Sequence, residues 1–165
     1  MSFLNLRLTL TVSINKQLKN VRYFSYDALR HADELEEIGL RINKRQYFLS
    51  LRRHKGVNFV KLSEISHYKR SVIYLELDKE VPEFIANLNS INQLTPRLEQ
   101  DVKCNDEIKQ IVFSMLPGSH DLIGTSLKRS DGGKDKNGIR IEAAMKEELT
   151  SAFQSLIDRA SQFNK

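Results

Sequence analysis

Apolar and polar residues alternate strictly along residues 4–14. The apolar side chains all fall on one parity, at Leu4, Leu6, Leu8, Leu10, Val12 and Ile14. Because successive side chains of a strand point to opposite faces, this period predicts a long strand with one buried face. A strand of this length in a chain of this size either crosses a broad sheet or pairs in part with another chain.

The spacing of the next apolar residues predicts a helix over residues 26–38. Ser25 is a suitable N-cap for this helix, and Gly39 supplies a stop signal. The apolar side of the helix consists of Leu29, Ala32, Leu35 and Ile38.

Alternation returns in residues 47–62, which predict a hairpin. Residues 47–52 alternate between two parities, and residues 57–62 follow a turn at His54, Lys55 and Gly56. A single basic helix over residues 41–54 is the alternative, and the pattern leaves it open. Residues 71–77 are dense in β-branched and aromatic side chains and predict a further strand.

The second half of the chain has mainly helical spacing. Helices are predicted from Pro82 through Ile91, from Pro96 to Met115 and over residues 141–163. Asn105 is an alternative N-cap for a separate helix. Residues 117–138 contain five glycines and predict a flexible loop before the last helix.

These elements predict an α+β fold. We expect an antiparallel sheet built mainly from the N-terminal half, packed against helices mainly from the C-terminal half. The 165 residues suffice for one domain with an ordinary core, strand-rich over residues 1–78 and helical over residues 80–165. The sequence shows no internal repeat.

The positive charge of the chain is concentrated in its first third. Residues 1–63 contain 12 Lys or Arg against 5 Asp or Glu, whereas the rest contains 14 against 16. Between Glu37 and Glu64 there is no acidic residue at all. A cationic segment of this length, interleaved with aromatic residues, is typical of a surface that contacts nucleic-acid phosphates.

The basic segment supplies the candidate nucleic-acid-binding residues. Its cations would meet several phosphates at once, and Tyr47 or Phe48 would stack on a base. The candidate positions are Arg41, Lys44, Arg45, Tyr47, Arg52, Arg53, Lys55 and Lys61. A solvated edge hairpin, or a surface that docks an acidic protein, accounts for the same composition.

The sequence is therefore compatible with two functions. The first is a non-catalytic accessory protein that binds nucleic-acid backbone through this segment. The alternative is an interaction subunit of a larger, DNA-handling complex that makes no direct nucleic-acid contact. Residues 4–14 or 141–163 would then supply a homo- or hetero-oligomeric contact.

No motif predicts catalysis, a cofactor or a metal. The loop Asp131–Gly138 lacks the spacing of a phosphate-binding or calcium loop, and residues 61–74 leave too little room for a helix-turn-helix. Ser119, His120 and Asp121 are adjacent, so they cannot converge as a triad. We therefore predict a protein without catalytic residues.

Compartment is inferred from cysteine usage and hydropathy. Cys104 is the single cysteine, which excludes an intrachain disulfide and suits a reducing compartment. No stretch reaches the roughly 20 apolar residues that a membrane span needs. The sequence therefore predicts a cytoplasmic protein with no membrane partner.

Overall fold

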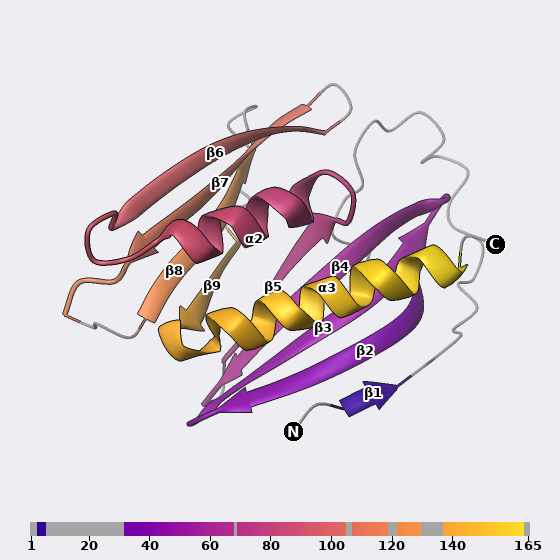
Figure 1. Cartoon of the computed structure of the whole chain (residues 1–165), viewed down its shortest axis with the longest axis horizontal. Helices are drawn as coiled ribbons and strands as arrows, with labels where there is room; N and C mark the ends of the chain where they lie inside the picture. Colours follow the sequence, from indigo (N-terminus) through magenta and orange to yellow (C-terminus); the bar gives the residue numbers. More distant parts are fainter. Residues whose placement is uncertain are drawn as a thin grey trace.

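The computed structural model describes residues 3–5, 32–67, 69–104, 107–118, 122–129 and 137–163. These residues form two antiparallel sheets and two α-helices (Figure 1). The first sheet has the strand order β1 (Phe3–Asn5), β2 (Asp33–Ile42), β3 (Arg45–His54), β4 (Val57–Ser66) and β5 (Lys69–Glu76). The second has the order β6 (Arg97–Cys104), β7 (Glu107–Met115), β8 (Leu122–Arg129) and β9 (Asn137–Glu142).

The two halves of the chain repeat one order of elements. Strands β2–β5 are followed by helix α2 (Glu80–Ser90), and strands β6–β9 by a 3-10 turn, η2 (Ala143–Met145), and helix α3 (Lys146–Phe163). Helix α3 contacts β2 and β3, whereas α2 contacts β6 and β7 as well as β5. In Figure 1, α3 runs across the first sheet and α2 lies beside the second. Each half therefore supplies a helix that packs on the sheet of the other.

One hydrophobic cluster joins both sheets and both helices. At its centre, the ring of Phe84 on α2 lies 4.9 Å from that of Phe113 on β7 and 5.5 Å from that of Phe153 on α3. All three rings are fully buried. Burial of one such side chain contributes roughly 1.5–3 kcal/mol, so this contact is a main tie between the two halves.

The α+β class is confirmed, as are several individual elements. The hairpin is present as β3 and β4, which excludes the basic helix over residues 41–54. Its two turn residues, Lys55 and Gly56, both have positive φ, at 49° and 77°. Two-residue hairpin turns require this conformation, and glycine adopts it readily. The strand expected over 71–77 is β5, and the helices expected from Pro82 and over the C-terminal residues are α2 and α3.

The helix predicted over residues 26–38 is wrong where the structure describes it. Residues 33–38 belong to β2, and Gly39 lies within that strand opposite Phe48. A β-bulge between Glu34 and Glu36 shifts the register, so that Leu35 and Ile38 are both buried although they are three residues apart. The bulge thus produced a helix-like spacing in a strand.

The prediction that the second half is mainly helical is also wrong. Residues 97–104 and 107–115 form β6 and β7, and part of the predicted loop, residues 122–129, forms β8. The core-facing side of these strands is not wholly apolar, because Gln100 and Lys109 lie on the same face as Ile111 and Phe113. Lys109 is accommodated there by an ion pair of 3.2 Å with the buried Glu80 of α2. The sheets therefore span both halves of the chain.

Two predictions fall partly outside the described residues. Of the strand expected over 4–14, the structure describes Leu4 and Asn5, which pair with Ile38 and Glu37 of β2. Of the loop expected over 117–138, residues 119–121 and 130–136 lie outside the described residues.

Candidate functional site

Strand alternation divides the basic segment between the two faces of the first sheet. The inner face of β3, toward the core, carries Tyr47, Leu49 and Leu51, which are fully buried. Arg45 and Arg53 share this parity. Arg52 lies on the outer face. Arg41 and Lys61 lie there too, because their partners on β3, Gln46 and Ser50, have the same parity as Arg52. The segment therefore does not form one continuous cationic surface.

Arg45 is held between two carboxylates. Its guanidinium forms ion pairs with Glu64 of β4 and with Glu142 of β9, the latter at 3.2 Å. All three side chains are largely buried, with exposed fractions of 15% for Arg45, 5% for Glu64 and 14% for Glu142. Arg45 therefore links the first sheet to the second and has little surface to offer a ligand.

Tyr47 joins the same two sheets through its hydroxyl group. The hydroxyl donates to the carbonyl oxygen of Arg140 at 2.9 Å and accepts from the amide of Glu142 at 3.1 Å. A carboxylate oxygen of Glu64 accepts from the amide of Arg140 at 2.9 Å. Side chains of the first sheet thus satisfy the open edge of β9, which would otherwise leave backbone groups unpaired. A fully buried ring cannot stack on a base.

Ionisation of Tyr47 should destabilise the fold at high pH. Burial raises the pKa of Tyr47 from 10.0 to about 12. The folded state keeps the proton that the unfolded state loses, so the stabilisation is complete below pH 10 and is lost as pH rises toward 12. We expect Tyr47→Phe to lower stability at pH 7 by about 1–3 kcal/mol, since two backbone groups lose their partner. Urea unfolding from pH 8 to 11.5 should show a smaller decline for the variant. An equal decline would contradict the assignment.

Arg52 and Arg53 are also committed to internal partners. The guanidinium of Arg52 lies 2.9 Å from a carboxylate oxygen of Glu34 on the neighbouring strand. Arg53 donates to the side-chain oxygen of Asn58 at 3.0 Å and to the carbonyl oxygen of Phe163 at 3.2 Å. Phe163 ends α3, where an arginine complements the negative end of the helix dipole. Both arginines therefore have clear structural roles.

Lys61 is half-buried on the outer face. Burial lowers the pKa of Lys61, and the positive charges of Arg52 and Arg70 lower it further. Each of these effects disfavours the charged ammonium group. Lys61 is thus a weaker candidate for a phosphate contact than a fully solvated lysine.

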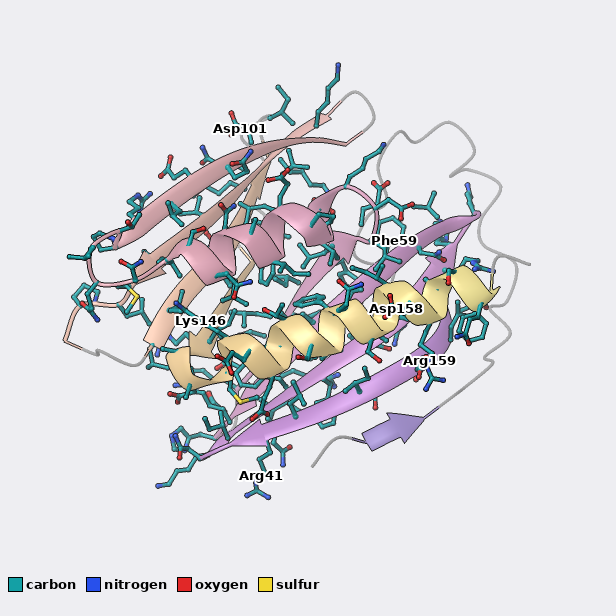
Figure 2. All side chains as sticks on the ribbon, viewed as in Figure 1. Arg41, Phe59, Asp101, Lys146, Asp158 and Arg159 are labelled. Atoms are coloured by element: carbon teal, nitrogen blue, oxygen red, sulfur yellow. The ribbon has the colours of Figure 1, made fainter. Side chains whose placement is uncertain are left out.

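The remaining predicted cations are exposed but lie at opposite ends of the first sheet. Lys55 is in the β3–β4 turn, whereas Lys44 is in the β2–β3 turn, with Arg41 close to it on β2. In Figure 2 the side chain of Arg41 extends away from the body of the protein. Arg41 and Lys44 therefore belong to one surface, and Lys55 to another.

Three exposed cations outside the predicted set lie at the same end as Lys44. Lys69 and Arg70 begin β5, and Arg140 is on β9, where its backbone contacts Tyr47 and Glu64. Arg41 and Arg70 are the two ends of a row of paired residues that crosses four strands by way of Gln46 and Ile65. Three strand spacings correspond to roughly 14 Å. We name this end of the first sheet the basic end, which consists of Arg41, Lys44, Lys69, Arg70 and Arg140. Arg41 and Arg70 lie on its outer face, whereas Lys69, paired with Ser66, lies on the inner face toward Arg140.

The charge of the basic end exceeds that of the acids beside it. Glu64 and Glu142 are both paired with Arg45, and Glu64 is almost fully buried. Within the described part of the chain, none of the five side chains of the basic end takes part in an ion pair. The five exposed cations and Arg45 thus carry six positive charges against the two negative charges of Glu64 and Glu142, which leaves a local surplus of four.

A cleft of about 330 Å³ opens between the two sheets beside the basic end. Ser66, Lys69 and Ser71 line it from the first sheet, and Arg140 lines it from the second. Gly124 and Gly138 also line it, so part of its wall is backbone without a side chain. Glu64 is its acidic residue, and its carboxylate is already engaged by Arg45 and the amide of Arg140. The cleft thus combines two cations with the hydroxyl-bearing residues Ser66, Ser71 and Thr125.

Across the described ranges, no three His, Cys, Asp or Glu side chains gather in a way that could hold a metal ion. Neither described helix is both long and apolar enough to cross a membrane.

Sequence comparison adds no family to this description. No protein-family model matches the chain, and no curated protein matches it.

Proposed function

We propose that this protein binds the phosphate backbone of nucleic acid through the basic end, without catalysing a reaction on it. The observation that carries the proposal is the clustering of five exposed cations beside Glu64 and Glu142, whose two negative charges are offset in part by Arg45. Surface cations in excess of the neighbouring acids attract a polyanion, because binding releases the counterions condensed on it. Of the binding residues predicted from the sequence, Arg41 and Lys44 belong to the basic end. Lys69, Arg70 and Arg140 are binding residues that the sequence did not predict.

The span of the basic end suits a polyanion rather than one isolated charge. Arg41 and Arg70 are separated by roughly 14 Å along their row, and one nucleic-acid strand advances about 3.4 Å per phosphate. Several consecutive phosphates can therefore be contacted together. Phe48 is half-buried on the outer face, two residues along β3 from Gln46, the partner of Arg41, and it pairs with Gly39. It supplies an aromatic surface near these cations on which a base can stack.

Docking of an acidic protein is the second candidate function. The same surplus of cations supports it, since an acidic protein surface is also a dense array of negative charge. In that case the protein would serve as an interaction subunit of a larger assembly. A protein partner and a nucleic acid differ in that only the latter presents regularly spaced phosphates.

Fluorescence anisotropy separates these two candidates. A labelled mixed-sequence single strand and the corresponding duplex would be titrated with protein at 50 and 200 mM salt, with poly-glutamate as competitor. We expect micromolar or tighter binding at 50 mM salt that weakens steeply at 200 mM, and poor competition by poly-glutamate at matched charge. Absence of binding at 50 mM salt would overturn the proposal, and equal competition by poly-glutamate would favour the acidic protein.

A further inference from the structure

We propose that the cleft between the two sheets is a seat for a phosphate monoester carried on a nucleotide-sized group. This inference rests on the proposed function, because it identifies a terminal phosphate as the part of a strand that enters the cleft. The lining residues that carry the argument are Lys69 and Arg140, together with the hydroxyl groups of Ser66 and Ser71.

The charge of the cleft matches a phosphate monoester. A terminal phosphate carries close to two negative charges at pH 7 and three strong acceptor oxygens, whereas an internal phosphate carries one negative charge. Lys69 and Arg140 supply two positive charges, and Ser66 and Ser71 supply neutral donors. Charge-assisted hydrogen bonds of this kind are about twice as strong as neutral ones. The carboxylate of Glu64 does not cancel this charge, because it is paired with Arg45.

The size of the cleft also selects the end of a strand. A volume of about 330 Å³ lies at the low end of the range of small-molecule sites and accommodates one nucleotide. A chain that passed through would have to enter and leave the same small space, whereas a terminus needs only to enter. The remaining three cations of the basic end, Arg41, Lys44 and Arg70, would then contact the phosphates that follow.

Two glycines of the second sheet form a tightly packed part of the wall of the cleft. Gly138 lies on β9, and a Cβ atom added to it would come within 3.2 Å of the carbonyl oxygen of Thr125. At Gly124 an added Cβ atom would approach the side chain of Leu116 to 2.9 Å. Side chains at these two positions would therefore crowd the wall of the cleft.

The test compares single strands that differ only in their terminus. A 3′-labelled oligonucleotide with a 5′-phosphate and the same oligonucleotide with a 5′-hydroxyl would be titrated with wild-type protein, with adenosine monophosphate as competitor. We expect the phosphorylated strand to bind about tenfold more tightly and adenosine monophosphate to remove that difference. If adenosine monophosphate competed equally with both strands, the rest of the strand would bind in the same cleft. That result would overturn the assignment of the cleft to the terminal phosphate.

Three variants connect this preference to the cleft. Ser71→Leu fills the cleft without changing charge, and the double variant Lys69→Gln/Arg140→Gln removes both cations from exposed positions. Both should abolish the preference for the phosphorylated strand, whereas the matched control Arg41→Gln/Lys44→Gln should weaken both strands equally and retain the preference. Thermal unfolding checks that Ser71→Leu is folded, and the double variant decides the question if it is not.

The two proposals fail in different ways. If both strands bind equally to the wild-type protein and Arg41→Gln/Lys44→Gln weakens both, the cleft proposal is wrong and the proposed function stands. If neither strand binds, the proposed function is wrong. In that case, calorimetric binding of adenosine monophosphate to the wild-type protein but not to Ser71→Leu would still support the cleft, and its absence would overturn it.

Discussion

Replacing Glu64 by alanine is expected to destabilise the fold by about 3 kcal/mol, measured by urea unfolding at pH 7. Glu64 is 4% exposed and makes two contacts that join the sheets. Its carboxylate pairs with the guanidinium of Arg45 and accepts from the amide of Arg140 on β9. Removal of Glu64 leaves the largely buried guanidinium of Arg45 with one carboxylate partner instead of two, and breaking a buried ion pair costs more than the pair contributes.

The remaining partner of Arg45 moderates this loss. Glu142, which lies 3.2 Å from the arginine, is unchanged in the variant, so we place the cost at the lower end of the usual range for broken buried pairs. The amide of Arg140 adds the cost of an unsatisfied backbone donor. Glu99→Ala is the matched control, because Glu99 pairs with Arg97 on an exposed surface, and its loss should cost less than about 1 kcal/mol. Equal effects of the two substitutions would contradict the role given to Glu64.

Neutralising three cations of the basic end is expected to weaken binding of a single strand roughly 100-fold at 50 mM salt. The variant is Arg41→Gln/Lys44→Gln/Arg70→Gln, which leaves Lys69 and Arg140 of the cleft unchanged. The three side chains are exposed and form no ion pair within the described ranges, so their loss should not disturb the fold. Anisotropy titration against wild-type protein measures the effect, and thermal unfolding should give midpoints that agree closely.

A control variant with the same change in net charge separates the effect of the position of the cations from the effect of total charge. Lys55→Gln/Lys79→Gln/Lys103→Gln also removes three positive charges from exposed side chains. Lys55 and Lys79 lie at the other end of the first sheet, and Lys103 is near the end of β6. We expect this control to weaken binding less than tenfold, through the long-range field alone. Comparable losses in the two triple variants would mean that general charge, not the basic end, accounts for binding.

The sequence predicted well those elements whose patterns are regular. The hairpin of β3 and β4 is clear because Tyr47, Leu49 and Leu51 are buried on one parity with a suitable turn after them. Helix α3 is equally clear, because its buried residues follow helical spacing from Leu149 to Ala160. In both cases local pattern and tertiary burial agree.

The second sheet escaped prediction because tertiary contacts override its local pattern. Lys109 occupies a core-facing position only because Glu80 arrives from α2, which no window along the chain reveals. The repeated order of four strands and a helix is likewise visible in the fold and not in the sequence. Strand patterns are weaker guides than helix patterns when polar residues occupy the buried parity.

The site was predictable only in part, for a related reason. A run of cations along a strand alternates between faces, and the sequence did not show which of them would meet Glu34, Glu64 or Glu142. Lys69 and Arg70 adjoin the basic segment and could have been included as a tandem pair. Arg140 lies far away in sequence and joins the basic end only because β9 docks on Tyr47 and Glu64.

The most direct test of the central claim is the salt dependence of single-strand binding by the wild-type protein and the two triple variants. The basic end predicts that the slope of log affinity against log salt becomes shallower by about 2 in Arg41→Gln/Lys44→Gln/Arg70→Gln, because each lost phosphate contact removes about 0.7. It predicts an unchanged slope for the control triple variant. An unchanged slope in the first variant, or an equal change in both, would contradict the claim that the basic end contacts the phosphate backbone.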